Sequence, residues 1–246
     1  DGYRVFPISH QSVTIIAALK EELEKRGVAT RCSCEVKEIS HEEDAKFRVA
    51  TSQGEFLAKN IIIATGGLGY PVLGAHGDGY RFATSLGHKI TALSPAMMPL
   101  KVKETWVADC RADTIAKVEM KVDLPKSKKL RAEGDLIFTK NGIRGPVVLD
   151  FARFVTPLLK AHDSVPILMN LTKGMHEEEI IQHLKKEAKE HHEHTILEHL
   201  HTLLPLSVAK ALCLQAKVDT TMHYFEIEGF KKDSLIKLLA WTPLHI

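Results

Sequence analysis

The segment that most constrains the fold is IIIATGGLGYP, at residues 61–71. Its three isoleucines are apolar on both faces of a strand, which is typical of the interior of a parallel sheet covered on both sides. The strand ends in four residues with little side-chain bulk: Ala64, Thr65, Gly66 and Gly67. In dinucleotide-binding folds, ligands lie beyond the carboxyl ends of parallel strands, where backbone must approach a phosphate or ribose. The segment therefore indicates a bound dinucleotide, and a tight turn that requires glycine is the alternative interpretation.

Helices and strands are also predicted around this segment. Residues 12–26 place apolar side chains at helical spacing, and Gly27 follows where a helix commonly ends. Apolar runs separated by polar turns predict three strands, at residues 28–40, 46–54 and 55–65. Residues 80–86 predict a second helix closed by Gly87. This mixture of helices and strands predicts an α/β fold.

The pattern changes near residue 90, which we interpret as a domain boundary between residues 1–90 and 91–246. Short strands separated by Pro, Gly and Asp follow, including one over GDLIFTKNGIRGPVVL at 134–149. They predict a small antiparallel sheet or β-barrel. Residues 175–216 have a helical composition, and the remaining residues predict a strand, a short helix and a final strand.

Composition excludes several classes of protein. The net charge of +2 comes from interleaved basic and acidic residues, so no nucleic-acid partner is expected. No stretch approaches the roughly 20 apolar residues of a membrane span, so no membrane partner is expected. Four cysteines in 246 residues do not form a disulfide framework, which favours a cytoplasmic location. Cys32 and Cys34 could form a C-x-C metal or redox pair, but packing on one strand face is favoured.

A second glycine-rich stretch opens the helix predicted near residue 80. Asp78 stands between Gly77 and Gly79, where free backbone amides could receive an anion or a polar ring edge. The favoured alternative is that Asp78 caps its own helix. Neither a G-x-G-x-x-G fingerprint nor a P-loop is present, so the element that would itself bind a pyrophosphate is missing.

Histidines suggest a metal site that we do not expect to be real. His194, Glu198 and His201 stand at i, i+4 and i+7, a spacing that could hold zinc on one helix face. His191 and His192 stand close by among Lys and Glu, as on a solvated helix, so no metal is expected. The catalytic acid or base is unassigned, since no catalytic triad can be ordered from spacing. His76 is a candidate only because it is an imidazole beside a glycine-rich turn.

Four motifs taken together resemble one family. They are GYRVFPIS at 2–9, residues 61–88, PAMMPL at 95–100, and GDLIFTKNGIRGP at 134–146. In this order they resemble bacterial FAD-dependent oxidoreductases of the aminoacetone-oxidase-like or BaiN-like type, also described as NAD(P)/FAD-dependent oxidoreductases. The resemblance implies a Rossmann-like FAD domain of the two-dinucleotide-binding kind, interrupted by an inserted β-barrel domain with a helical part. Residues 1–90 would be a partial FAD-binding domain and residues 91–246 the inserted domain.

The resemblance also implies which residues lie near FAD. Those carried over by position are Val36, Ala64, Thr65, Gly66, Gly67, Gly77, Asp78 and Gly79. Arg4, Phe6 and Pro7 match a stretch that would border the flavin or its substrate. This chain has Gly69 and Ala75-His76 where relatives carry hydroxyl side chains, which removes polar groups near the implied cofactor.

The expected activity is hydride or electron transfer through FAD, with NAD(P)H as an implied electron donor and a small molecule as substrate. The substrate and the oligomeric state are not predicted. The family's G-x-G-x-x-G segment and closing flavin segment lie outside this sequence, which opens without Met and stops on an apolar run. The alternative is therefore a non-catalytic fragment or interaction domain with an incomplete cofactor site.

Overall fold

A computed structural model describes residues 5–42, 44, 46–127 and 129–246. The chain divides into two compact units, Asp1–Ala92 and Leu93–Ile246, which are described separately. The fold is mixed α/β, as the sequence predicts. The assignment of the first unit as a partial FAD-binding domain and of the second as an inserted domain stays a prediction.

In its described residues, the first unit contains two α-helices and a three-stranded antiparallel sheet. Helix α1 (Ser12–Lys25) lies where the sequence predicts it, and α2 (Asp78–Ser85) overlaps the second predicted helix. The sheet has the order β1-β2-β3. Its strands and the 3-10 turn that follows are β1 (Val36–Glu42), β2 (Lys46–Thr51), β3 (Gly54–Ala58) and η2 (Pro71–Leu73).

The strand predicted at residues 55–65 is formed only in its first part, as β3, which pairs antiparallel with β2 and is not part of a buried parallel sheet. Residues 60–67 have no regular secondary structure, and Ile62 is 91% exposed. A central strand needs a hydrogen-bonded neighbour, and every strand pairing among the described residues is antiparallel and made elsewhere. The apolar run is therefore an irregular segment in which Ile62 and Ile63 are exposed and Ile61 is half-buried.

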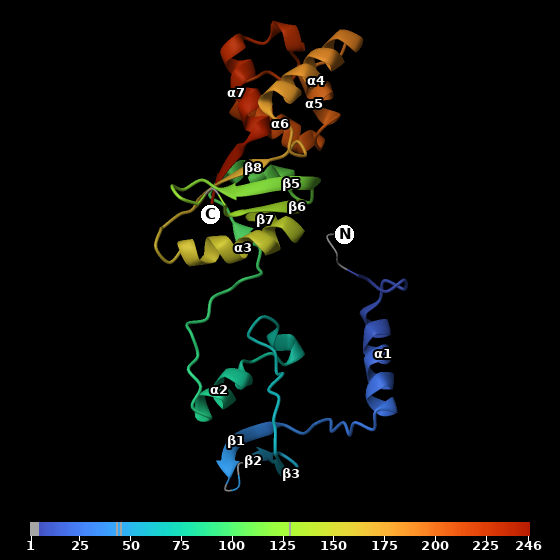
Figure 1. Cartoon of the computed structure of the whole chain (residues 1–246). Coiled ribbons are helices and arrows are strands. Elements are labelled where there is room, and N and C mark those ends of the chain that lie inside the picture. Colours follow the sequence, from blue (N-terminus) through green and yellow to red (C-terminus); the bar gives the residue numbers. More distant parts are fainter. Residues whose placement is uncertain (1–4, 43, 45, 128) are drawn as a thin grey trace. The chain divides into compact units, whose positions relative to one another are not determined.

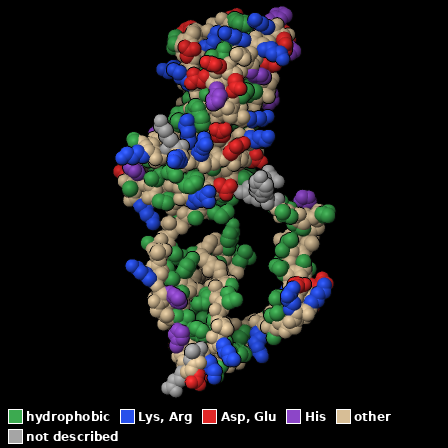
Figure 2. All heavy atoms as spheres, viewed as in Figure 1, with side chains coloured by type: hydrophobic (Ala, Val, Ile, Leu, Met, Phe, Trp, Pro, Cys, Tyr) green, Lys and Arg blue, Asp and Glu red, His purple; other side chains and the backbone are tan. Residues whose placement is uncertain are grey.

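The two units differ sharply in how much apolar surface they bury. Ile39 and Phe82 are the only described hydrophobic residues of the first unit that are buried, whereas the second unit has one continuous core. The apolar face of α1, including Val13, Leu19 and Leu23, is exposed. Figure 2 shows many uncovered hydrophobic side chains in the lower part of its view, which the first unit occupies. The first unit's described residues thus lack the core expected of an independently stable domain.

The second unit is built on a curled six-stranded antiparallel sheet of order β4-β7-β6-β5-β8-β9. The strands are β4 (Leu100–Lys101), β5 (Thr114–Val122), β6 (Arg131–Thr139), β7 (Gly142–Arg144), β8 (Pro166–Asn170) and β9 (Thr242–His245). The two edges approach each other, since the backbone N–H of Lys103 donates to the carbonyl of His245 at 2.9 Å. Glu104 adds a carboxylate oxygen that accepts from the N–H of His245 at 3.0 Å.

The strand predicted at residues 134–149 is instead part of a hairpin followed by a helix. Strands β6 and β7 pair through a short turn, and α3 (Pro146–Leu158) begins directly after Gly145. Gly145 has φ +112, and Pro146 occupies the first helical turn, where its missing N–H costs nothing. Buried residues at 147, 148, 151, 152 and 155 have helical spacing, a signal that the sequence-based interpretation missed.

Helices α4 (Glu177–Glu190), α5 (Ile196–His201) and α6 (Leu206–Gln215) occupy the region of helical composition. After it, the 3-10 turn η4 (Tyr224–Glu226) replaces the predicted strand, and α7 (Gly229–Ala240) leads into β9. Figure 1 shows α3 along one side of the curled sheet and α4–α7 grouped on the other. None of the helices that the structure describes is long and apolar enough to span a bilayer.

Cysteine environments give a first testable prediction. Cys110, in the 3-10 turn η3 (Thr105–Cys110), and Cys213 are buried, and desolvation raises the pKa of each thiol to about 12. Because the thiolate is the nucleophile, both are expected to resist iodoacetamide at mildly alkaline pH, whereas exposed Cys32 reacts. Peptide mass spectrometry of the native chain measures this, with chain unfolded in guanidinium chloride as the control. Labelling of Cys213 as fast as Cys32 in the native chain would contradict the buried core.

Candidate functional site

The two glycine-rich segments of the first unit lie against each other. A Cβ atom added to Gly79 would come within 3.0 Å of Cγ2 of Ile63 and still closer to the hydroxyl of Thr65. A Cβ atom at Gly77 would lie 2.7 Å from Cδ2 of Leu68. The start of α2 can approach residues 63–68 this closely because both positions are glycine.

Helix α2 also joins this contact to the sheet. Nη1 of Arg81 donates to the carbonyl of Lys37 at 2.8 Å, and the hydroxyl of Ser85 donates to the carbonyl of Ile39 at 3.5 Å. Both carbonyls belong to β1, which starts at the half-buried Val36. The structure therefore gathers the predicted site segments around one helix.

The backbone of residues 64–67 is open to a ligand. Ala64, Thr65 and Gly66 are exposed and Gly67 is half-buried, so other protein atoms do not cover them. Within the described ranges, no backbone hydrogen bond uses the N–H or carbonyl groups of residues 64–67. Gly66 has φ +74, a conformation that favours glycine. Free amides beside a helix start, with no side-chain bulk over them, fit the approach of a dinucleotide's phosphate or ribose.

Asp78 does not cap its helix, so the favoured sequence-based interpretation was wrong. The N-cap position is Gly77, with φ 86, and no side chain makes a capping hydrogen bond there. Asp78 lies in the first turn, and its Oδ1 accepts from Nη2 of Arg81 at 3.3 Å. Its carboxylate therefore faces a cation of its own helix, and the α2 amides are not occupied by a side-chain cap.

Several other predicted residues show no contact that would assign them a role. His76 is exposed, and its backbone N–H donates to the carbonyl of Gly74 at 3.1 Å. Phe6 is exposed and Pro7 is half-buried. Arg4 lies outside the described residues. No catalytic acid or base is therefore assigned.

The structure adds Tyr80, which the sequence-based interpretation did not single out. A Cβ atom at Gly67 would lie 3.2 Å from the Tyr80 hydroxyl, so this phenol stands directly beside the open backbone. The half-buried ring offers a hydroxyl that can donate or accept a hydrogen bond. The signal was its position in the first turn of the GDGYR helix, two residues after Asp78.

The helical zinc site suggested by spacing does not exist. His194 precedes α5, so it is not on one helix face with Glu198 and His201. Oε2 of Glu198 accepts from the backbone N–H of Thr195 at 2.7 Å in a capping box. The ring of His201 bonds through Nδ1 to the carbonyl of Leu204 at 3.1 Å. A capping box therefore engages Glu198, and a bond to the chain after α5 engages His201.

Comparison with known proteins identifies relatives at low identity. The chain is 24% identical over 248 aligned residues to a 3-dehydro-bile acid delta(4,6)-reductase of Clostridium scindens, covering 100% of this chain and 59% of the relative. It is 29% identical to a ribosomal RNA dihydrouridine synthase of Haemophilus influenzae, covering 58% of this chain and 36% of the relative. The corresponding Escherichia coli enzyme is 26% identical, covering 58% of this chain and 35% of the relative.

The chain thus spans between about a third and three fifths of the length of these relatives. A match to a family description covers residues 1–174, which include all the glycine-rich segments around α2 and the sheet of the second unit as far as β8. This extent is well over half of the 246 residues. The protein therefore belongs to the HI0933-like family, whose Rossmann domain it matches over residues 1–174.

Proposed function

We propose that this chain is part of a flavoprotein oxidoreductase that uses FAD to reduce a carbon–carbon double bond conjugated to a carbonyl group. The family match supports a flavoprotein oxidoreductase in general terms. The observation that carries the cofactor proposal is the contact between residues 63–68 and the start of α2, where the backbone is open. The finer assignment to the aminoacetone-oxidase-like or BaiN-like type belongs to the same proposal.

In this proposal the chain's own residues bind and orient the cofactor. The free amides of residues 64–67 and the uncapped start of α2 donate hydrogen bonds to it, and Val36 offers backbone to its adenine. The Tyr80 hydroxyl adds a polar contact beside Gly67. When bound and reduced by two electrons from NAD(P)H, the proposed donor, FAD would supply the hydride.

The names of the relatives support the proposed bond type. A dihydrouridine synthase and a delta(4,6)-reductase both carry out, by name, the reduction of a carbon–carbon double bond. Such a reduction adds a hydride to one carbon and a proton to its neighbour, so the site also needs a proton donor. His76 remains the sequence-based candidate for that donor.

Two classes of substrate follow from these relatives. We propose a small molecule, because the interleaved charges and net charge of +2 do not form a field for a nucleic-acid backbone. The relatives named for ribosomal RNA make a nucleic-acid substrate the second candidate. We also propose a cytoplasmic location, which is consistent with four unpaired cysteines.

Cofactor binding is the first experimental test. The purified chain is expected to quench flavin fluorescence and shift the visible absorbance of added FAD, with saturation at one FAD per chain. Riboflavin, which lacks the phosphates and adenosine, is the matched control and is expected to bind much more weakly. A chain that is colourless as purified and leaves the FAD spectrum unchanged would favour the non-catalytic alternative.

Substrate class is tested in a second assay, with FAD present. NADH or NADPH oxidation is followed with a 3-oxo-delta-4 steroid and, separately, with a uridine-containing RNA, and mass spectrometry detects the gain of two hydrogens. We expect turnover with the steroid. Turnover with the RNA alone would overturn the small-molecule proposal and support the second candidate.

A further inference from the structure

The turn between α4 and α5, in the second unit, gathers three metal-ligating side chains. Oε1 of Glu193 lies 3.9 Å from Nδ1 of His191 and 3.6 Å from Nε2 of His194. One nitrogen or oxygen atom from each of the three residues lies within 4.8 Å of the others. These residues do not belong to the glycine-rich site of the first unit.

The backbone of this turn is held in place by hydrogen bonds. The N–H of His194 donates to the carbonyl of His191 at 3.0 Å, which closes the turn. Nδ1 of His223 bonds to the carbonyl of His194 at 2.9 Å, and the N–H of Ile196 donates to the carbonyl of Met222 at 2.8 Å. The backbone that presents the ligands is therefore ordered before any ion binds, which lowers the entropy cost of binding.

A buried imidazole lies directly behind the cluster. The ring of His199 is 5.8 Å from that of His194, which in turn stacks on His191 at 5.0 Å. His199 is 1% exposed, and in the part of the chain that the structure describes its Nδ1 has no hydrogen-bond partner. An unpartnered buried nitrogen is uncommon in a native fold and calls for an explanation, of which a bound ion or water is one. This observation is independent of the surface cluster.

We propose that His191, Glu193 and His194 bind a divalent transition-metal ion of the zinc class. Ligand atoms at about 2.0–2.1 Å from a tetrahedral zinc lie roughly 3.3 Å apart. The observed separations of 3.6 and 3.9 Å are slightly larger, and small side-chain rotations close them. The side chains of His191 and His194 are 49% and 41% exposed, which leaves room for such rotations on the solvent side.

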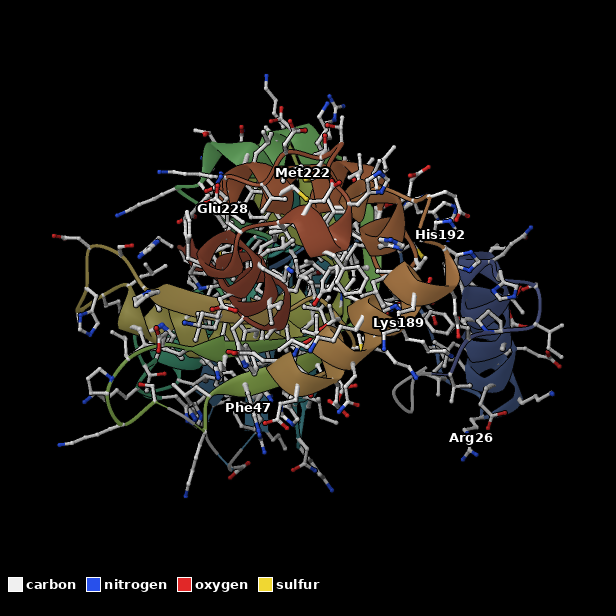
Figure 3. The ribbon with its side chains drawn as sticks, turned by 90° about the horizontal axis from the view of Figure 1, so that it is seen from above. Arg26, Phe47, Lys189, His192, Met222 and Glu228 are labelled. Atoms are coloured by element: carbon white, nitrogen blue, oxygen red, sulfur yellow. The ribbon has the colours of Figure 1, made fainter. Side chains whose placement is uncertain are left out.

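Two imidazoles and one carboxylate select this class of ion. Imidazole nitrogen suits zinc, nickel and copper, whereas magnesium and calcium prefer ligand sets made of oxygen. Water would complete the coordination, or His192, whose Nδ1 lies 3.6 Å from Oε2 of Glu193. Figure 3 locates the turn by the labelled Lys189 and His192 near the end of α4. A bound ion would link the end of α4 to the residues that precede α5.

The test uses the untagged chain and metal ions alone. Isothermal titration with Zn²⁺, and separately with Ni²⁺, is expected to show one site per chain, and Mg²⁺ is expected to show none. H191A/H194A should weaken Zn²⁺ binding by at least about 10–100-fold, since even the loss of a ligand's hydrogen-bond partner costs that much. E193Q, which keeps the shape of the side chain, should weaken it as well.

The matched control removes two exposed histidines elsewhere, in H88A/H162A, and is expected to bind Zn²⁺ like the unaltered chain. Zn²⁺ should raise the thermal midpoint of the second unit in the unaltered chain and in the control, but not in H191A/H194A. Imidazole NMR signals of His191 and His194 should shift together on Zn²⁺ addition. Equal affinity in H191A/H194A and H88A/H162A, or several weak sites, would mean adventitious binding only and would overturn the proposal.

Discussion

Replacing Phe151 with alanine is expected to lower the free energy of unfolding of the second unit by about 3–5 kcal/mol. Phe151 lies on α3, which packs on the curled sheet, and its side chain is fully buried. Its ring also makes an edge contact with Phe154, with ring centroids 6.2 Å apart. Truncation removes this apolar surface and leaves a cavity that a rigid sheet cannot collapse to fill.

Urea unfolding followed by tryptophan fluorescence measures this change. Both tryptophans of the chain, Trp106 and Trp241, lie in the second unit, so their signal reports that unit alone. The matched control is Phe230→Ala on α7, where the ring is 68% exposed and the expected change is within about 0.5 kcal/mol. Equal effects of the two substitutions would contradict the packing of α3 against the sheet.

Replacing Gly79 with alanine is expected to weaken FAD binding by at least about tenfold, which corresponds to about 1.4 kcal/mol. Alanine inside a helix normally stabilises it by roughly 0.5–1 kcal/mol relative to glycine. At Gly79 the added Cβ meets the side chains of Thr65 and Ile63, so α2 must move away from the open backbone. A loss of FAD affinity therefore indicates that α2 packs closely on residues 63–65. If α2 were a helix without this contact, the alanine would stabilise it and would leave FAD affinity unchanged.

Flavin fluorescence titration measures the affinity, and Gly229→Ala, at the start of α7, is the matched control. Gly229 has no atom within 4 Å of an added Cβ and lies in the second unit, so its substitution should leave FAD affinity nearly unchanged. A second readout does not depend on FAD. Trypsin should cleave faster after Arg81 in the Gly79 variant, because Arg81 loses its bond to the carbonyl of Lys37. Unchanged cleavage and affinity would show that residues 63–65 do not pack on α2.

Local signals made much of the fold predictable. Helical spacing of apolar residues and the following Gly27 predicted α1 with nearly correct bounds. The glycine-rich start and the following Gly87 did the same for α2. Polar turns separated the strands that became β1, β2 and β3, although the first prediction starts before β1 and the third extends beyond β3. Helix α3 was missed because the apolar residues after Pro146 were joined to the strand before them, across the polar turn at residues 139–141 and Arg144. Gly145-Pro146 and the helical spacing of the apolar residues that follow marked the change from strand to helix.

Residues 61–65, the unformed second part of the strand predicted at 55–65, and the histidine cluster show the limits of local patterns. An apolar run indicates a strand only when another strand lies beside it to accept its hydrogen bonds, and sequence spacing does not supply that neighbour. The zinc site suggested by the spacing of His194, Glu198 and His201 required a continuous helix through residue 194. The chain instead turns there, and α5 starts at Ile196. That turn, and not a helix face, brings His191, Glu193 and His194 together. The contact between Thr65 and Gly79 was likewise beyond sequence spacing, and the role of these two residues in cofactor binding stays a prediction.

The bond between Lys103 and His245 has a consequence for how the second unit is made in the cell. Its two partners are separated by most of that unit's length, so the sheet edges cannot meet until synthesis has passed β9. Contacts this distant in sequence slow folding, because a long loop must be ordered before they form. During translation, the edges of β4 and β8 are therefore exposed to other chains, and we expect nascent chains stalled before residue 242 to aggregate or to recruit chaperones.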